Sequence, residues 1–218
     1  MQIQSHIQTA IPVLDIGDSV EAAIAFFRDT TFSHIAVTQG GYFLGILGDM
    51  ELDGAKASDT LEDYRYNLEA FFVRRESNWL DVLTAFSRND ANLLAVLDDK
   101  EKVVGYYGLP EIVSSFIDTP FFTEPGDIVV IAKGAKDYAF SEIAQIVESN
   151  NAKVIGAFIT DIRNDIVQLT LKMSAASLNE VLQTFRRYNY TILLGNKDDQ
   201  FMEDLKQRSD YLDKYLNV

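Results

Sequence analysis

The stretch of sequence from Phe43 to Leu52 returns in the same frame from Val103 to Ile112. In each copy a glycine is followed three residues later by a second glycine and three residues after that by a glutamate. The equivalent pairs are Gly45 and Gly105, Gly48 and Gly108, and Glu51 and Glu111, at a constant offset of 60. An internal repeat constrains the fold more than any single motif does. We therefore expect a pseudo-symmetric domain with a cleft between its halves.

Each copy of this signature stretch predicts a short strand that stops at a glycine and is followed by a helix. A carboxylate in the first turn of a helix is favoured by the helix dipole, and Pro110 is tolerated there. The same geometry suits a ligand, because glycine lets a backbone come close and a carboxylate accepts hydrogen bonds from two ribose hydroxyls. Turn and capping chemistry alone also explains these residues. Both interpretations stay open at this point.

The elements that precede the signature stretch are repeated as well, at an offset of 59. The apolar helical positions Val20, Ala23, Ile24 and Phe27 match Trp79, Val82, Leu83 and Phe86. The buried-strand pattern HIAV at 34–37 matches LLAV at 93–96. The change of offset from 59 to 60 falls in the charged turn at 98–101, where an insertion is well tolerated.

This order of helix, HIAV-type strand, turn, G-x-x-G-x-x-E strand and helix, present twice, resembles a pair of cystathionine-β-synthase (CBS) domains. The resemblance covers roughly residues 1–118 and implies two βαββα units, about 1–65 and 66–118, packed side by side through their sheets. It implies a regulatory protein and not an enzyme. Members of the family commonly bind AMP, ADP, ATP or S-adenosylmethionine in clefts between the two repeats.

The resemblance also implies which residues line those clefts. They are Ala36, Gly45, Gly48 and Glu51 in the first repeat and Ala95, Gly105, Gly108 and Glu111 in the second. Glycines 48 and 108 stand where the family has Thr or Ser, the two glutamates replace aspartate, and the two alanines replace a proline. A lost hydroxyl removes a phosphate hydrogen bond, about 0.5–1.5 kcal/mol if neutral and up to about 3 kcal/mol if charge-assisted. The pattern therefore favours an adenosine-like or low-charge ligand over ATP.

A second domain is predicted after the proline-containing segment 119–126, which we interpret as a linker. Residues 127–195 predict the order βαββαβ of a ferredoxin-like arrangement, with a hairpin turn at 161–165. Next to a CBS pair, this order resembles an ACT domain, a small ligand-binding and dimerising module. The sequence AKDY at 135–138 stands where that family tends to have Asp-x-Pro-Gly before the helix. A tyrosine in place of the glycine argues against a standard amino-acid site and favours a module that pairs subunits by extending its sheet.

The predicted fold class is mixed α/β (α+β): tandem CBS repeats, a ferredoxin-like ACT-like domain, and an amphipathic C-terminal helix at 196–218. Two CBS domains followed by one ACT domain are similar in order to the acetoin-utilisation family of regulatory proteins.

The composition restricts which kinds of partner the protein can bind and in which cellular compartment we expect it. The net charge of −14 argues against nucleic acid and anionic membrane as partners, because both need a basic face. The absence of cysteine excludes disulfides, thiolate metal sites and thiol catalysis. The N-terminal residues lack the features of a signal peptide, and no apolar run approaches the roughly 20 residues that span a bilayer. We expect a cytoplasmic protein.

Catalytic and metal-binding motifs are not recognisable. His6 and His34 are the only histidines, and the sequence contains no HExxH, P-loop or GxSxG motif. We therefore predict no catalytic or metal-binding residues. The first hypothesis is a homodimeric sensor that binds an adenosyl-type ligand between the CBS repeats and couples it to dimer packing. The second is an interaction or dimerisation scaffold with degenerate, empty clefts, and the third is an enzyme with an unrecognised carboxylate site.

Overall fold

The chain folds into two compact units, Met1–Ile117 and Asp118–Val218. The computed structural model describes residues 3–56, 58–174 and 178–194. The predicted C-terminal helix at 196–218 lies outside the described residues. The mixed α/β (α+β) class that the sequence predicts is confirmed.

The first unit contains two copies of one small arrangement. The first copy holds β1 (Leu14–Asp15), α1 (Val20–Asp29), β2 (His34–Gln39) and β3 (Tyr42–Gly48). The second holds β4 (Val73–Arg74), α2 (Trp79–Arg88), β5 (Leu93–Leu97), β6 (Val103–Gly108) and α3 (Leu109–Ile117). Each copy forms a three-stranded sheet, in the orders β1-β2-β3 and β4-β5-β6. In both sheets the first pair of strands is parallel and the second pair antiparallel.

The strand register repeats together with the strand order. His34 lies opposite Gly48 in the first sheet, and Leu93 lies opposite Gly108 in the second. These pairs follow from the offsets of 59 and 60, because the extra residue falls in the turn between the paired strands. The duplication seen in the sequence is therefore a duplication of backbone structure.

The two copies differ in the element that follows the signature strand. In the second copy this element is the helix α3, as predicted, whereas in the first it is only a 3-10 turn, Asp49–Leu52 (η2). The predicted α-helix in the first copy is therefore wrong. Gly54, with a φ of +76°, follows at once, and residues 53–60 lack the apolar spacing of residues 112–117. A helix that cannot bury an apolar face is not stabilised by packing. A second 3-10 segment, Leu61–Asn67 (η3), then leads toward β4.

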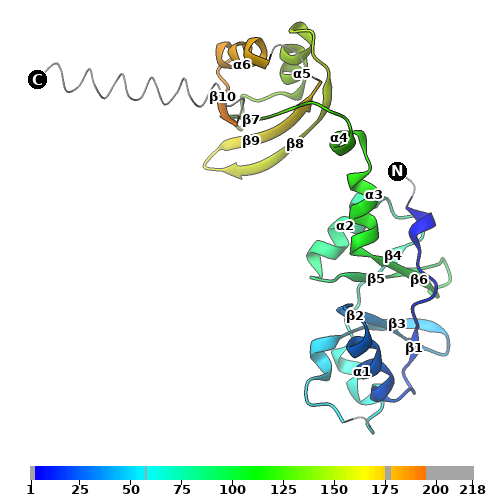
Figure 1. Ribbon diagram of the computed structural model, residues 1–218. Coiled ribbons are helices and arrows are strands. Elements are labelled where there is room, and N and C mark those ends of the chain that lie inside the picture. The colour runs from blue at the N-terminus through cyan, green and yellow to red at the C-terminus, as the bar shows by residue number, and fades with distance from the viewer. Residues whose placement is uncertain (1–2, 57, 175–177, 195–218) are drawn as a thin grey trace, which may run out of the picture. The chain divides into compact units, whose positions relative to one another are not determined.

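The two repeats meet through β2 and β3 on one side and β5 and β6 on the other (Figure 1). The buried side chains of this contact are Ala36, Ile46, Leu93, Ala95 and Tyr106. The Tyr106 hydroxyl donates to the Pro12 carbonyl at 2.8 Å and accepts the Ala36 backbone N–H at 3.2 Å. One side chain of the second repeat therefore pairs with two backbone groups of the first, of which the Ala36 N–H is buried.

A polar clasp joins the repeats at the start of β2 and β5. The Ser33 backbone N–H donates to Asn92 Oδ1 at 2.8 Å, and the Asn92 backbone N–H donates to Ser33 Oγ at 3.1 Å. The two residues are equivalent positions, 59 apart, so the contact is reciprocal. Asn92 Nδ2 also donates to the Thr31 carbonyl at 2.8 Å. These bonds lock the relative position of the two sheets.

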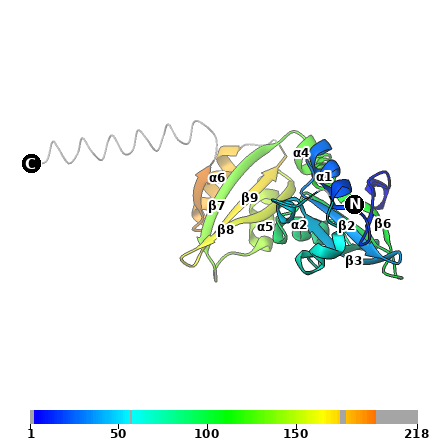
Figure 2. The same ribbon diagram turned by 90° about the horizontal axis from the view of Figure 1, so that it is seen from below.

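The second unit is a four-stranded antiparallel sheet with two helices on one face, as Figure 1 and Figure 2 show. Its elements are α4 (Pro120–Thr123), β7 (Asp127–Gly134), α5 (Phe140–Ser149), β8 (Val154–Arg163), β9 (Ile166–Met173), α6 (Leu178–Arg187) and β10 (Thr191–Leu194). The strand order β10-β7-β9-β8 is that of a ferredoxin-like βαββαβ fold. The core is formed between the helices and the strand residues that face them, among them Val129, Ile131 and Leu169 of the strands and Phe185 of α6.

The hairpin between β8 and β9 is tighter than predicted. The strands extend through Arg163 and from Ile166, so the predicted five-residue turn at 161–165 is a two-residue turn of Asn164 and Asp165. Both residues have positive φ, +50° and +59°. Paired positive φ values are typical of the two-residue hairpin turns that match strand twist, and Asn and Asp tolerate them. The predicted linker at 119–126 also contains a short helix, α4.

Tyr106 and its neighbour Tyr107 allow a matched test of the contact between the repeats. Both are fully buried, but the Tyr107 hydroxyl has no partner among the described residues. We expect Tyr106→Phe to lower the free energy of unfolding by about 1–3 kcal/mol, because it leaves the buried Ala36 N–H unpaired. Tyr107→Phe is expected to be neutral or stabilising. Urea unfolding followed by the fluorescence of Trp79, the only tryptophan, measures both variants, and equal effects would contradict the assigned role.

Candidate functional site

The first glycine of each signature strand is required by packing. A segment of the chain crosses each strand beside this glycine, through the bridges Ile46 to Glu69 and Gln8 to Tyr106. A Cβ on residue 45 would lie 2.8 Å from Leu68 Cβ, and one on residue 105 would lie 2.6 Å from Ile7 Cγ2. Both distances are shorter than folded proteins tolerate. These glycines therefore admit the crossing segment, whether or not a ligand binds.

The two alanines predicted for the ligand site lie in the buried contact between the repeats. Ala36 and Ala95 are fully inaccessible to solvent. The backbone N–H of Ala36 is the group that donates to the Tyr106 hydroxyl, and a proline at this position would lack that N–H. Alanine at 36 and tyrosine at 106 therefore complement each other, and burial raises the pKa of the Tyr106 hydroxyl.

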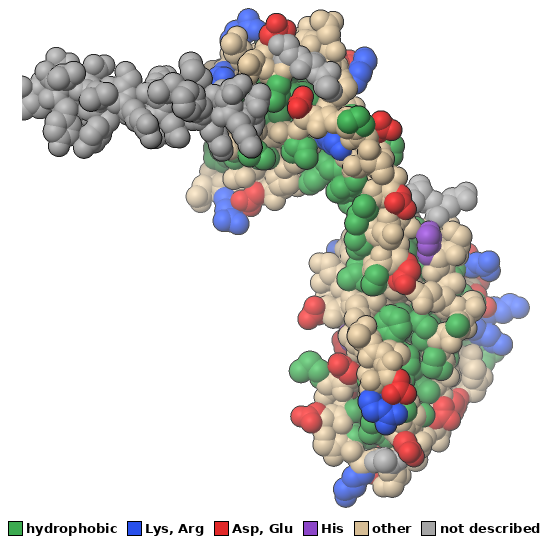
Figure 3. Space-filling model, viewed as in Figure 1, with side chains coloured by type: hydrophobic (Ala, Val, Ile, Leu, Met, Phe, Trp, Pro, Cys, Tyr) green, Lys and Arg blue, Asp and Glu red, His purple; other side chains and the backbone are tan. Residues whose placement is uncertain are grey.

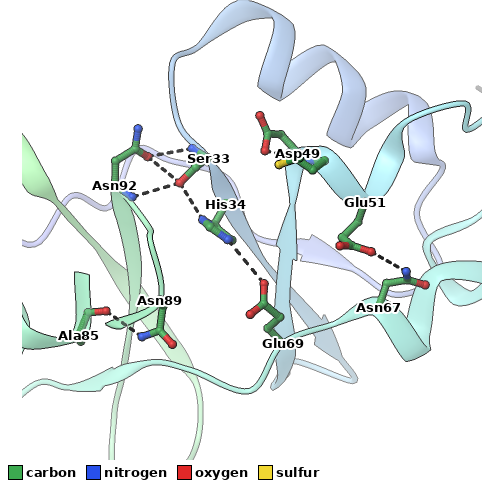
Figure 4. Close-up of polar contacts among 10 residues, drawn as sticks. Ser33, His34, Asp49, Glu51, Asn67, Glu69, Ala85, Asn89 and Asn92 are labelled. Atoms are coloured by element: carbon green, nitrogen blue, oxygen red, sulfur yellow. Dashed lines mark hydrogen bonds and ion pairs between the residues drawn. The ribbon is translucent and has the colours of Figure 1, made fainter. Parts of the chain in front are cut away.

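The remaining predicted residues of the first repeat, Gly48 and Glu51, belong to a group that we call the first signature site. It consists of Gly48 and the polar residues His34, Glu51, Asn67 and Glu69, and Figure 4 shows these four side chains. The pairing of β2 with β3 places the His34 ring beside Gly48. Asn67 Nδ2 donates to Glu51 Oε2 at 2.5 Å, which holds this carboxylate toward η3. His34 Nε2 lies 3.7 Å from Glu69 Oε1. The strand, the 3-10 turn and the crossing segment thus each contribute polar groups to one place.

His34 is the one titratable group at this site that is buried, with 9% of its surface exposed. Burial lowers its pKa, while the carboxylates of Glu69, Asp49 and Asp90 act in the opposite direction. Burial dominates because removing an imidazolium from water opposes its charged form. The ring is therefore mainly neutral near pH 7. It also lies edge-on to Phe71, with ring centroids 5.3 Å apart.

Ser33, His34 and Glu69 form a line of hydrogen-bonding groups that superficially resembles a hydrolytic triad. Ser33 Oγ lies 2.7 Å from His34 Nδ1. However, the same oxygen accepts the Asn92 backbone N–H and lies 3.1 Å from Asn92 Oδ1. A hydroxyl engaged on three sides within the clasp is not presented to a substrate as a nucleophile. The arrangement instead connects the first signature site to the contact between the repeats.

The second signature site consists of Leu93, Gly108, Glu111 and Gln8. Leu93 takes the place of His34 and is almost fully buried. The Glu111 carboxylate lies over Gly108, so closely that a side chain at this position would overlap Glu111 Oε2. Gln8 Nε2 would lie 3.0 Å from the same added atom. The second site thus has the predicted glycine and glutamate in direct proximity, but it is less polar than the first.

Sequence reasoning missed the contributions of His34, Asn67, Glu69 and Gln8. His34 lies opposite Gly48 only because a bulge between Val37 and Thr38 shifts the register of β2 and β3 by one residue, and the sequence pattern does not predict this bulge. Asn67 is the last residue of η3, and Glu69 and Gln8 come from the crossing segments, which have no regular pattern of their own. Their location depends on tertiary pairing, namely the isolated bridges at Glu69 and Gln8.

The predicted ACT-like loop at 135–138 is closed on itself. The Asp137 backbone N–H donates to the Gly134 carbonyl at 2.9 Å. Tyr138 packs against the core of the second unit and lies edge-on to Phe140, with centroids 6.1 Å apart. The tyrosine that replaces the family's glycine therefore has a packing role.

A second polar contact lies near this loop, at the start of α5. Lys133 Nζ lies 2.6 Å from Glu142 Oε1 and 4.2 Å from the centroid of the Tyr190 ring. The hydrogen bond with Lys133 lowers the pKa of Glu142. The ammonium group has both an anionic and an aromatic partner. This contact ties β7 to α5 and leaves Lys133 engaged.

Within residues 3–56, 58–174 and 178–194, no three or more His, Asp or Glu side chains come together in a way that could hold a metal ion. None of the helices in these ranges combines the length and apolarity that crossing a bilayer requires.

Comparison with known proteins gives structural neighbours only. No family model and no curated protein matches the sequence. Among solved structures, the chain is similar to a CBS domain pair/ACT domain protein from Thermotoga maritima, with 19% identity, a TM-score of 0.49 and coverage of 54% of this chain and 98% of that chain. It is also similar to the CBS domains of a transcriptional regulator from Streptococcus pneumoniae, with 13% identity, a TM-score of 0.47 and coverage of 52% and 98%.

A third neighbour is the CBS domain of a bacterial CNNM/CorC family Mg²⁺ transporter, solved in complex with ATP. Its identity is 13%, its TM-score 0.44, and the match covers 54% of this chain and 87% of that chain. All three neighbours are described as CBS-domain proteins, and each match covers about half of this chain. The two three-stranded sheets of the first unit are defined by the strand pairing of this chain itself.

The lowered pKa of His34 predicts how stability depends on pH. The folded state favours the neutral ring, so the stabilisation is complete above the ordinary pKa of about 6.5 and is lost as the pH falls through the folded-state value. We expect the slope of unfolding free energy between pH 7 and pH 5 to be reduced in His34→Leu, which copies Leu93. Urea unfolding monitored by Trp79 fluorescence at both pH values measures this slope. An unchanged slope in the variant would contradict the assignment.

Proposed function

We propose that residues 1–118 are a CBS-type pair that acts as a regulatory sensor of an adenosyl-type ligand, and that residues 127–195 are an ACT-like module that pairs subunits in a homodimer. The observation that carries this proposal is the repeated site geometry. In both repeats a buried glycine that ends a strand lies next to an exposed glutamate and a crossing segment from elsewhere in the chain.

The glutamates are suited to hold a nucleoside. Glu51 and Glu111 are exposed, and each lies one turn beyond a strand whose last residue has no side chain. A carboxylate in this position accepts hydrogen bonds from two ribose hydroxyls, and the adjacent glycine lets the ligand approach the backbone. AMP, ADP, ATP and S-adenosylmethionine share this ribose and are the ligands proposed for the site. No residue is assigned a catalytic role.

Coupling to function would use the contact between the repeats. A ligand shifts a protein between two arrangements only if it binds one arrangement more tightly than the other. His34 touches both the first signature site and the Ser33–Asn92 clasp. Ligand binding beside Gly48 would therefore change the packing of the two repeats. We propose that a cytoplasmic homodimer transmits this change to a regulated partner.

A ligand panel tests the proposed function. We expect one or more of AMP, ADP, ATP, S-adenosylmethionine and adenosine to raise the melting temperature of the full chain. At about 100 times its dissociation constant, a ligand adds roughly 2.7 kcal/mol to stability, or about 5–10 °C for a chain of this size. Differential scanning fluorimetry measures the shift. If no ligand of the panel raises the melting temperature at millimolar concentration, the sensor function is rejected and the scaffold function is favoured.

The second candidate function is an interaction or dimerisation scaffold, and an exposed edge strand favours it. β8 is the last strand of its sheet, with β9 on one side only. Phe158, Ile159 and Ile162 on this strand are exposed, and Figure 3 shows hydrophobic side chains gathered over β8 and β9. Edge strands with exposed apolar side chains tend to pair with another chain. Pairing of β8 with its copy would extend the sheet across two subunits.

Subunit pairing through β8 is tested by Ile162→Lys. We expect this change to raise the dimer dissociation constant by about tenfold or more, because it places a charge in the apolar contact between two edge strands. The matched control is Ile128→Lys on the inner strand β7, since both side chains are exposed, at 62% and 49%. Sedimentation velocity of both variants and the parent measures the assembly state. A monomeric parent, or equal effects of both variants, would contradict pairing through β8.

A further inference from the structure

We propose that the two signature sites are unequal: the first is the working ligand site and takes a neutral or cationic nucleoside, whereas the second is closed by its own Glu111. This inference rests on the proposed function and specifies which site acts and on which ligand class. It is carried by the space above each glycine, by the polar groups around it, and by the charges that act there.

The space above Gly48 is open. A side-chain carbon added to this residue would make only ordinary contacts, 3.5 Å to His34 Nε2 and 3.9 Å to Glu51 Cγ. The Glu51 carboxylate does not fill this space, because Asn67 holds it through the hydrogen bond of 2.5 Å. The position that a side-chain carbon would take at Gly48 is therefore free of overlap, and the carboxylate of the repeat's own glutamate does not cover it.

The space above Gly108 is occupied. The same added carbon would overlap Glu111 Oε2 and lie 3.0 Å from Gln8 Nε2. The glutamate that should hold a ligand's ribose thus covers the glycine that should admit it. A ligand must push this carboxylate aside before it reaches the backbone. The contact acts as an internal competitor at the second site.

The polar groups around the two glycines also favour ligand binding at the first site over the second. The first site presents the imidazole of His34, the amide of Asn67 and the carboxylate of Glu69 next to Glu51 (Figure 4). At the second site the residue equivalent to His34 is Leu93, which offers no hydrogen bond. A nucleoside carries hydroxyl and ring-nitrogen groups that must be paired when they leave water. The first site can pair more of them.

The charges at the first site set the ligand class. Every charged group that shifts the pKa of His34 is a carboxylate, namely Glu69, Asp49 and Asp90. The ring itself is mainly neutral near pH 7, and Glu51 adds a further negative charge beside it. A phosphate group would be repelled in this environment, whereas a sulfonium or ammonium group would be attracted. The geometry therefore favours adenosine and S-adenosylmethionine over ATP.

Isothermal titration of the full chain with adenosine, S-adenosylmethionine and ATP tests this inference, with Glu51→Ala and Glu111→Ala as a matched pair. We expect one molecule of adenosine or S-adenosylmethionine per chain and weaker binding of ATP. Glu51→Ala should weaken binding about 10- to 100-fold, the effect of losing charge-assisted hydrogen bonds. Glu111→Ala should change the affinity of the first site by less than about threefold, because Glu111 lies over Gly108 at the second site. His34→Leu, which copies the second site, should also weaken binding at the first.

Several results would overturn the inference while leaving the proposed function intact. They are two equivalent sites per chain, loss of binding in Glu111→Ala but not in Glu51→Ala, or ATP as the tightest ligand. Absence of binding by the parent and by both variants would instead reject the proposed function, and the inference with it. Urea unfolding of each variant, followed by Trp79 fluorescence, establishes that a loss of binding is not a loss of folding.

Discussion

Tyr106 lies at the centre of the surface where the two repeats meet, and the rest of the first unit depends on this contact. Its hydroxyl reaches from the second repeat to the Ala36 N–H and the Pro12 carbonyl of the first. The Ala36 N–H is buried among apolar side chains, so its hydrogen bond to Tyr106 replaces a partner that water would otherwise supply. The Ser33–Asn92 clasp extends the contact to the ends of β2 and β5. Each signature site is therefore held in place by the other repeat as well as by its own.

Pseudo-symmetry of the backbone coexists with unequal chemistry at the two sites. The strands, bridges and glycines correspond, but the first repeat has His34 where the second has Leu93. A buried imidazole needs hydrogen-bonding partners, and Ser33 and Glu69 lie beside it. A leucine needs none. The difference of one residue thus introduces a polar connection from the first site to the clasp, and the second repeat has no counterpart at this position.

The second unit is built differently from the first, because its single sheet has helices on one face and one long edge strand. Alternation along β9 places Val167, Leu169 and Leu171 toward the helices, as the period of two in the sequence predicts. β8 departs from this alternation through two register shifts. Bulges of this kind blunt an edge without removing its capacity to pair. The apolar side chains Phe158, Ile159 and Ile162 of β8 remain exposed.

The short-range pattern of residues predicted the duplicated unit, the offset between its copies and the βαββαβ order. It could do so because burial imposes periods of 2 and 3.6 on strands and helices. It was enough to single out the glycines and glutamates, but not to say how they are used. The crossing segments at Gln8 and Glu69, the direction of the Glu51 and Glu111 carboxylates, and the absence of a helix after Glu51 were decided by tertiary structure. Those features depend on contacts between residues distant in the chain, and no local period encodes such contacts.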